Sequence, residues 1–224
     1  MKINHRLKKI ATYVEKDSKV LDIGCDHALL DIYLIREEIA RECVAADIKE
    51  GPLQAAKENI RRYQLDHKIQ TQLGDGLDVY QSDIDTVIIS GLGGKTMQGI
   101  FSRHLDVLKT VHTIVLSPNN YQADIKKYLC KRGFYIAEET FVKEHNIVYQ
   151  IIKFKQGKRK YCRRDYFFGP MLRKNKDILF QEFYQRELKS REILLALLPK
   201  NFRLKRFQIK KEMKLLKEEL ESSK

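Results

Sequence analysis

Short apolar runs alternate with amphipathic segments over the first two thirds of the chain. Five runs are rich in β-branched or small apolar residues, and we interpret them as β-strands: residues 19–23, 42–48, 69–73, 86–90 and 113–116. The segments between them repeat apolar residues with the period of an α-helix, and a short amphipathic helix is predicted over residues 4–14. Two more runs, 134–142 and 147–155, predict a β-hairpin joined around His145 and Asn146.

The order of these elements predicts the fold. Strand and helix alternate five times before the hairpin closes the series, and the run Thr-Val-Ile-Ile-Ser at 86–90 suits a strand buried on both faces. We therefore expect an α/β protein with a seven-stranded Rossmann-like sheet of the class I methyltransferase type. Such sheets bind ligands at the carboxyl ends of their strands, which predicts the place of a site.

A different pattern begins after the hairpin. Residues 156–165 are polar and basic without apolar periodicity, and we place a boundary there between a domain of residues 1–157 and one of residues 158–224. Two helical patterns follow, broken at Pro199; the second has the 4-3-4 spacing of a coiled-coil seam. Their apolar residues are Leu172, Leu179, Phe183, Ile193 and Leu197 in the first, and Ile209, Met213, Leu216 and Leu220 in the second. Because the link between them is short, we expect a C-terminal antiparallel helical coiled coil.

The net charge of +13 is concentrated in the last part of the chain. Residues 156–224 hold 20 Lys and Arg against 9 Asp and Glu, a net charge of +11, which leaves +2 for residues 1–155. This asymmetry is typical of an arm that binds a polyanion, and Tyr161, Phe167 and Phe168 among the basic residues suit stacking on RNA bases. Two alternatives stay open: a solvated lysine-rich helical face, and phenylalanines that seat the coiled coil on the first domain.

The strongest candidate for a binding site is the end of the first strand. Asp22, Gly24 and Asp26 follow its apolar residues, and a helical pattern begins at Ala28. Gly24 would let backbone approach a ligand closely, because glycine has no Cβ. A dinucleotide fingerprint requires three spaced glycines, so the single glycine here argues against NAD or FAD.

Two further acids follow later strands at corresponding places. Asp47 lies 25 residues after Asp22, near the spacing at which an acid on the second strand meets a ribose hydroxyl pair, and Asp75 lies in a Gly-Asp-Gly turn. A sulfonium cofactor needs an acid for its ribose, an acid or amide for its adenine and backbone for its methionine tail. Asp47, Asp75 and Gly24 suit these contacts. The alternatives are a helix N-cap for Asp47 and an ordinary turn residue for Asp75.

The sequence also restricts the atom that such an enzyme methylates. Enzymes for carbon 5 of a pyrimidine use a cysteine nucleophile, and no cysteine stands in the motifs after the fourth or fifth strand. Enzymes for exocyclic amines often carry Asn/Asp-Pro-Pro-aromatic where this chain has Ser90-Gly91-Leu92-Gly93. A ring nitrogen such as adenine N1 needs alignment and stabilisation of the developing positive charge, without a general base. We expect Asp26 to supply that stabilisation, with helix capping as its alternative; for the adjacent His27 the alternative is a hydrogen bond that fixes the turn.

Five motifs can be read together: Asp22-Ile23-Gly24-Cys25-Asp26-His27-Ala28-x-Leu30, Gly51-Pro52-Leu53, Gly74-Asp75-Gly76-Leu77, Gly91-Leu92-Gly93-Gly94 and Leu116-Ser117-Pro118-Asn119. In combination they resemble the bacterial tRNA (adenine-N1)-methyltransferase family that acts at position 22 of tRNA. The resemblance covers most of residues 5–185, and Gly169-Pro170-x-Leu172 with Lys174-Asn175 continues it. The chain departs from the family pattern at Ser117, where Gln is usual, and at Asp31, where Pro is usual.

The resemblance implies a methyl transfer from S-adenosylmethionine to adenine N1 in tRNA. The expected residues are Asp26 for catalysis; Asp22, Gly24, His27, Asp47, Ile48, Asp75, Gly76 and Gly91 for the cofactor; and Arg6, Pro118, Asn119, Lys158, Arg159, Lys160, Arg163 and Arg164 for tRNA.

The remaining expectations concern partners and alternatives. The four cysteines form no C-x-x-C pair, and no segment approaches the roughly 20 apolar residues of a membrane span, so we expect a cytoplasmic, monomeric enzyme without a metal. The alternatives are a non-catalytic RNA-binding protein on this fold and a methyltransferase for another RNA. A small-molecule methyltransferase would leave the charge of residues 156–224 unexplained.

Overall fold

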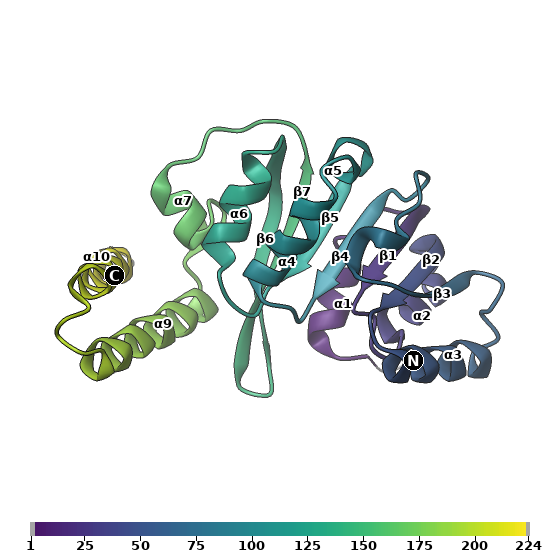
Figure 1. The fold of residues 1–224 in the computed structure, drawn as a ribbon, viewed down its shortest axis with the longest axis horizontal. Coiled ribbons are helices and arrows are strands. Elements are labelled where there is room, and N and C mark those ends of the chain that lie inside the picture. Colours follow the sequence, from purple (N-terminus) through teal and green to yellow (C-terminus); the bar gives the residue numbers. More distant parts are fainter. Residues whose placement is uncertain (1–2, 223–224) are drawn as a thin grey trace. The chain divides into compact units, whose positions relative to one another are not determined.

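A computed structural model describes residues 3–222 and contains a seven-stranded sheet in the order β3-β2-β1-β4-β5-β7-β6 (Figure 1). The neighbours among β1 to β5 pair in parallel, and β7 is antiparallel to both β5 and β6. The predicted α/β fold with a closing hairpin is therefore confirmed. The strands are β1 Ser18–Ile23, β2 Ala40–Asp47, β3 Ile69–Leu73, β4 Thr86–Ser90, β5 Thr113–Ser117, β6 Phe134–Glu144 and β7 Ile147–Gln156.

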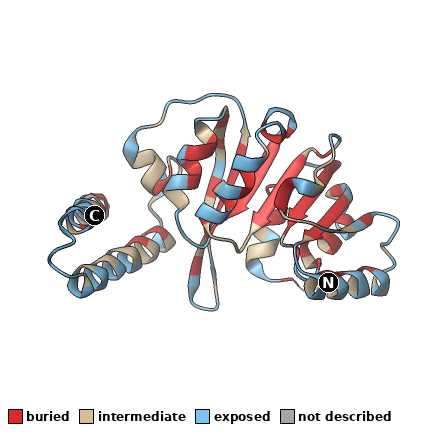
Figure 2. Cartoon of the chain, viewed as in Figure 1, coloured by how far each residue is buried: buried red, intermediate tan, exposed pale blue. Residues whose placement is uncertain are grey.

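Two layers of helix cover the sheet (Figure 2). One apolar core lies under α1 His5–Ala11, α2 Leu29–Arg36 and α3 Glu50–Arg62. The other lies under the 3₁₀ helix η1 Gly76–Val79, α4 Gly94–Arg103, α5 Val107–Thr110 and α6 Gln122–Cys130. In β4 the side chains alternate between the two cores: Val87 and Ile89 enter one and Ile88 the other, and all three are fully buried. This explains the uninterrupted apolar run in that strand, because both of its faces are covered.

The hairpin closes at the predicted place. His145 and Asn146 join β6 to β7 and both have left-handed backbone angles, with φ of 45° and 63°. Positive φ at both central residues is the requirement of a two-residue turn that matches strand twist, and asparagine tolerates it well.

The segment after β7 packs on the sheet domain. The pattern analysis predicts no helix over residues 156–165, whereas the structure has α7 at Arg163–Phe168, which begins with a capping box between Cys162 and Asp165. The compact first unit extends to Met171, and the second begins at Leu172, whereas the sequence placed a boundary at 157/158.

A buried carboxylate holds this segment in place. Glu139 on β6 lies 3.7 Å from Lys126 Nζ, with both side chains fully buried, and accepts a 2.7 Å hydrogen bond from the Met171 backbone N–H. Gly169 crosses directly over Glu139, so that an added Cβ would collide with its carboxylate. Burial lowers the pKa of Lys126, and the charge of Glu139 opposes that shift.

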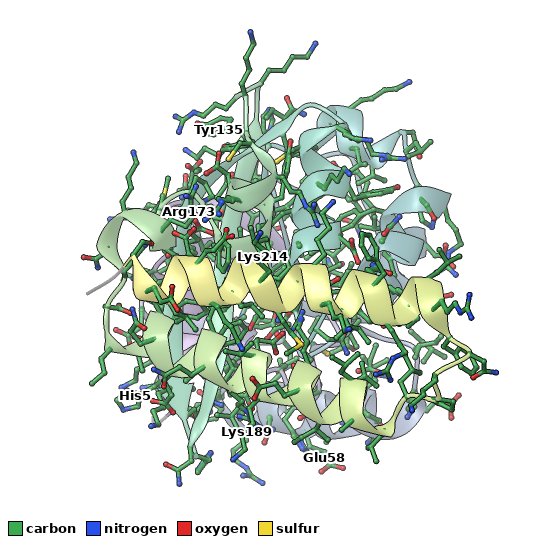
Figure 3. All side chains as sticks on the ribbon, turned by 90° about the vertical axis from the view of Figure 1, so that its left-hand side faces the viewer. His5, Glu58, Tyr135, Arg173, Lys189 and Lys214 are labelled. Atoms are coloured by element: carbon green, nitrogen blue, oxygen red, sulfur yellow. The ribbon has the colours of Figure 1, made fainter. Side chains whose placement is uncertain are left out.

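The second unit contains an antiparallel helix pair. It consists of the short α8 Leu172–Asn175, then α9 Ile178–Leu197 and α10 Arg203–Glu221. Arg191 pairs with Glu212 and Glu192 with Lys217, while Arg173 and Lys176 both reach the buried Glu219 at 3.1 Å. Arg206 near the start of α10 donates to the carbonyls of Leu195 and Leu198 at the end of α9, whereas Glu219 near the end of α10 meets Arg173 and Lys176 just before α9, so the two helices are antiparallel. Figure 3 shows α9 and α10 side by side, with exposed lysines such as Lys189 and Lys214.

The apolar seam of this pair is shorter than its sequence pattern. Ile209 and Leu216 are buried as expected, but Ile193 and Leu197 are 53% and 76% exposed. Arg191 lies on the inner side of α9, where it bonds to Glu187 and Glu212. The predicted apolar contacts of Ile193 and Leu197 are therefore wrong, because an ion-pair cluster occupies that part of the interface.

Candidate active site

The carboxyl edge of the parallel strands collects most of the predicted site residues. β1 lies between β2 and β4, and the chain order reverses at this point: β2 and β3 extend to one side, β4 and β5 to the other. In sheets of this kind the crevice outside such a reversal is the ordinary ligand site. Asp22 pairs with Ala45 and Ile88 in register, so the loops that follow β1, β2 and β4 begin side by side.

Gly24 turns the chain across the end of β2. Its φ is +77°, and the N–H groups of Gly24 and Cys25 donate to the Ala46 carbonyl at 2.8 and 3.0 Å. A Cβ added at Gly24 would meet no atom within 4 Å, so the backbone here is open. The turn therefore needs glycine for its left-handed angle, and it leaves room for a ligand.

Asp26 is exposed at the tip of the same loop. Its φ is +52°, its side chain is 74% exposed, and its Oδ1 lies 3.6 Å from His27 Nε2. The N-cap of α2 is Ala28, with a φ of 54° and no side-chain cap, so Asp26 does not serve as that cap. Asn59 Nδ2 donates to the His27 carbonyl at 3.0 Å, which shows that the backbone of His27 ties the turn to α3. The Asp26 carboxylate is consequently directed to solvent and the His27 ring.

Asp47 ends β2 and shapes the next turn. Its Oδ1 accepts a hydrogen bond from the Lys49 N–H at 2.9 Å. The N-cap of α3 is Lys49, so Asp47 lies two residues before the helix cap. The neighbouring Ile48 is 62% exposed, and an apolar side chain this open beside an acid suits one face of a nucleoside.

Asp75 is fixed by an arginine. Its Oδ2 lies 2.8 Å from Arg103 Nη2 at the end of α4. Asp75 is the N-cap of η1 without a side-chain cap bond, so the Gly-Asp-Gly turn does not consume its carboxylate. Gly76 has a φ of 66° and an added Cβ would lie 2.8 Å from Ile100 Cγ2, which explains glycine there by close packing on α4.

Asp22 lies beneath these loops and is only 5% exposed. It contacts Asp31 in the first turn of α2, which is fully buried, and no described side chain donates to either Asp31 carboxylate oxygen. Burial, and then the charge of Asp31, raise the pKa of Asp22 well above its usual range, and burial raises the pKa of Asp31 to about 7. The sequence reading identified Asp22 but not Asp31 as a site residue, although an acid between the apolar Leu30 and Ile32 was a signal.

The loops after β4 and β5 are tied to each other. The Gly91 N–H donates to the Ser117 carbonyl at 3.1 Å, the Gly91 carbonyl accepts from Asn119 Nδ2, and the Asn119 N–H donates to the Leu92 carbonyl at 2.9 Å. Pro118 supplies a carbonyl to Gln122 Nε2 at 3.3 Å. Gly91 has a φ of +82° with open space where a Cβ would stand. Asn119 therefore positions the loops, and Gly91 leaves a second open stretch of backbone.

An aromatic residue that the sequence reading missed stands at this edge. Tyr121 follows the loop after β5 with a left-handed φ of 52°, and its side chain is 48% exposed. Lys95 Nζ in the first turn of α4 lies 4.3 Å from its ring centroid. An exposed ring with a cation over one face suits contact with a base and its phosphate.

The predicted tRNA-binding residues lie at different edges of the sheet. Arg6 on α1 stacks over the Tyr149 ring at 4.5 Å, near the hairpin turn and thus at the carboxyl edge. Lys155 of β7 pairs with Thr113 at the start of β5, so Lys158, Arg159 and Lys160 leave the sheet at the opposite edge. Arg163 and Arg164 lie on α7. The structure thus separates these five basic residues from the Gly24 loop.

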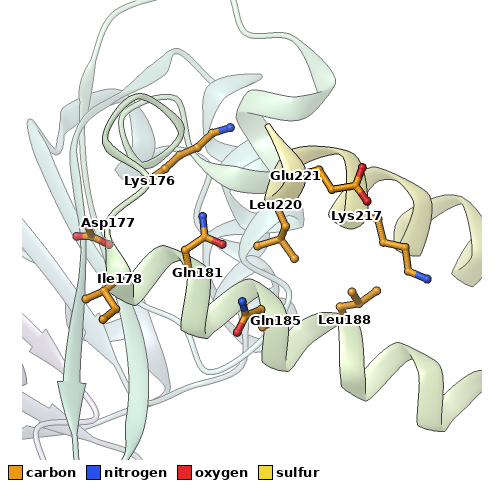
Figure 4. Close-up of a pocket in the computed structure, with 9 residues that line it drawn as sticks. All are labelled: Lys176, Asp177, Ile178, Gln181, Gln185, Leu188, Lys217, Leu220 and Glu221. Carbon is orange, nitrogen blue, oxygen red and sulfur yellow. The ribbon is translucent and has the colours of Figure 1, made fainter. Parts of the chain in front are cut away.

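Other parts of the structure give weaker indications of a binding site. Within residues 3–222 no group of three or more His, Cys, Asp or Glu is arranged to hold a metal ion. A groove of about 470 Å³ between α9 and α10 is lined by two lysines and two acids, Lys176, Lys217, Asp177 and Glu221, so its charge is balanced (Figure 4). None of the helices in the described part of the chain is both long and apolar enough to cross a membrane.

The sequence as a whole matches one known family. A family model described as tRNA (adenine(22)-N(1))-methyltransferase aligns with residues 20–221. The chain belongs to this family. The family was predicted from the five motifs, and that prediction is confirmed.

Individual relatives agree with this assignment. The tRNA (adenine(22)-N(1))-methyltransferase of Bacillus subtilis is 28% identical over 195 residues, which cover 84% of this chain and 82% of the relative. The crystal structure of the B. subtilis m1A22 tRNA methyltransferase has a TM-score of 0.90 at 26% identity and covers 98% of this chain and 99% of that one. A Streptococcus pneumoniae protein crystallised with S-adenosyl-L-methionine has a TM-score of 0.90 at 30% identity, with 98% and 100% of the chains covered.

Proposed function

We propose that this protein transfers the methyl group of S-adenosylmethionine to N1 of adenine 22 in tRNA. The observation that carries the proposal is the family match over residues 20–221, which spans both the sheet domain and the helix pair. The carboxyl edge supports it, because Asp26, Asp47 and Asp75 all reach that edge on loops that follow parallel strands.

The residues at the edge fit the cofactor. S-adenosylmethionine carries a cationic sulfonium and an ammonium, and four acids surround this edge: Asp22, Asp26, Asp47 and Asp75. The open backbone at Gly24 and Gly91 would contact the methionine part of the cofactor. The Asp47 oxygen that does not bond to the Lys49 N–H would accept hydrogen bonds from the ribose hydroxyls. Ile48 and Gly76 would border the adenine, with Asp75 as acceptor for its amine and His27 on the side of Asp26.

The cofactor supplies an electrophilic methyl group, and the protein's own residues orient the acceptor. Adenine N1 gains a positive charge as its bond to carbon forms, and a carboxylate near the ring stabilises that charge. We assign this role to Asp26, whose carboxylate is 74% exposed in the loop that follows the Gly24 turn. Tyr121 would stack on the target base, which must leave its stack before N1 is accessible.

The basic residues would hold the body of the tRNA. Arg6 at the carboxyl edge, with the Pro118–Asn119 loop, would contact RNA near the target. A second group of basic residues lies away from the Gly24 loop: Lys158, Arg159, Lys160, Arg163 and Arg164. Because tRNA is much larger than the sheet, we assign this group to phosphates distant from the target base. The helix pair adds further lysines, and we infer that a monomer is sufficient because every proposed contact comes from one chain.

The competing function is a non-catalytic RNA-binding protein on the same fold. Incubation of the protein with tRNA and S-adenosylmethionine labelled in its methyl group separates the two. Label in the tRNA supports the enzyme, and tRNA binding without cofactor binding or label supports the alternative.

A further inference from the structure

The buried pair Asp22–Asp31 is not explained by the fold. Asp31 is 0% exposed, and no described side chain donates to either of its carboxylate oxygens. An unpaired buried carboxylate is costly, and two adjacent carboxyls lower that cost by sharing a proton. Asp22 and Asp31 are within hydrogen-bonding reach of each other.

The surroundings supply no positive charge to this pair. The charge of Asp47 on β2 raises the pKa of Asp22 further, and the two acids in turn raise the pKa of two neighbouring thiols, Cys43 on β2 and Cys25 in the Gly24 loop. The sides of α1 and α3 that enter the same core are apolar, with Ile10 on α1 and Leu53 and Ala56 on α3. The neighbouring Ile88 of β4 is apolar as well. The charged side chains that act on the pair are thus acids, which with burial favour a bound proton, while the backbone N–H of Asp31 opposes it to a smaller extent.

We propose that Asp31 is a positioning residue that keeps one proton on the Asp22–Asp31 pair until the cation of the cofactor enters. This inference rests on the proposed function. Asp22 leads directly into the open Gly24 turn, so a cation at that turn lies next to the pair. Its charge favours the ionised pair, and the shared proton leaves to solvent. Cofactor binding and proton release are consequently linked.

The proposal predicts the pH dependence of affinity. With the pKa of Asp31 raised to about 7, S-adenosylmethionine binds more tightly as pH rises from 5.5 to 7.0, because a proton no longer has to be removed. The dissociation constant falls by up to about tenfold per pH unit for one released proton. In Asp31→Asn the side-chain amide donates to Asp22, which stays ionised, and this dependence is lost.

The shared proton can also be tested in the ligand-free protein, through the pH dependence of stability. Because the folded-state pKa values of both acids are raised, the folded chain binds more protons than the unfolded chain around neutral pH. Their contribution to stability is therefore present at acid pH and lost as pH rises through about 7. The Tm of Asp31→Asn relative to the parent should rise steadily between pH 5.5 and 8.5.

Calorimetry provides the test. S-adenosylmethionine is titrated at pH 6.5 in buffers of different ionisation enthalpy, which counts the protons released, with Glu37→Gln as control because Glu37 is an exposed acid at the end of the same helix. The parent and Glu37→Gln should release close to one proton more than Asp31→Asn.

The outcomes separate the two proposals. Equal proton release and equal pH dependence of Tm in the parent and Asp31→Asn would overturn the role of Asp31. Absence of cofactor binding at every pH, with the Tm difference as predicted, would instead contradict the proposed function and leave the shared proton established.

Discussion

Asp75 on the loop after β3 and Arg103 at the end of α4 form an ion pair with 2.8 Å between Oδ2 and Nη2. The two side chains are 44% and 52% exposed, so the pair contributes little to stability, at most about 1 kcal/mol. Its effect is to orient the Asp75 carboxylate while Oδ1 stays available.

This geometry predicts different results for the two partners. Asp75→Ala should weaken S-adenosylmethionine binding by about 1–3 kcal/mol through a lost hydrogen bond to a charged group. Arg103→Met should weaken it less and change the free energy of unfolding by under about 1 kcal/mol. Calorimetry and urea unfolding measure both quantities. If Asp75→Ala binds the cofactor with parental affinity, Asp75 does not contact it.

Asp47 should bind the ribose with the oxygen that the Lys49 N–H does not occupy. Asp47→Ala is expected to lower cofactor affinity by about 1–3 kcal/mol. Asp47→Asn preserves an acceptor for the turn and serves as the control for loop structure. A folded Asp47→Ala protein with unchanged affinity would remove this residue from the site.

Asp26 should act on the rate of transfer. Asp26→Ala is expected to lower the single-turnover rate by about 10- to 1000-fold while the affinities for cofactor and tRNA stay nearly constant, because the group acts on charge that develops only in the transition state. Asp26→Asn retains the shape and left-handed tolerance of the loop, and should be slow as well. A collapse of both affinities with an unchanged rate at saturation would instead identify a binding residue.

The helix pair should bind tRNA through phosphates. Lys210, Lys211 and Lys214 are exposed on α10, and their replacement by Gln should reduce the slope of log affinity against log salt by about 2. A matched variant replaces Lys57, Arg62 and Lys68, which are exposed near the β3 edge. An equal change of the salt slope in the two triple variants would indicate that only the net charge of the protein matters. An unchanged slope in the α10 variant would contradict tRNA binding by α10.

The order of the elements was predictable from the sequence because strands buried on both faces leave long apolar runs, as in Val87-Ile88-Ile89. The hairpin turn at His145-Asn146 was equally clear. The helix α7 was missed because it is short and depends on contacts that no local pattern contains: the capping box of Cys162 and Asp165.

The loop positions of the site were predictable, but the partners of its side chains were not. Asp75 and Arg103 are 28 residues apart in sequence, and their ion pair depends on how α4 packs against η1. The same holds for Asp22 and Asp31, which belong to a strand and the helix packed on it. A single acid between apolar helical residues indicates an unusual buried position, but the sequence does not show which residue that acid contacts.

The central claim is methylation of one nitrogen in one nucleotide. The most direct measurement is mass spectrometry of nuclease-digested tRNA after reaction with S-adenosylmethionine, on a transcript with adenosine 22 and on one with guanosine at that position. We predict 1-methyladenosine in the fragment that contains position 22 of the first transcript, and no added methyl group in the second. Methylation at another position or another atom, or equal methylation of both transcripts, would contradict the account.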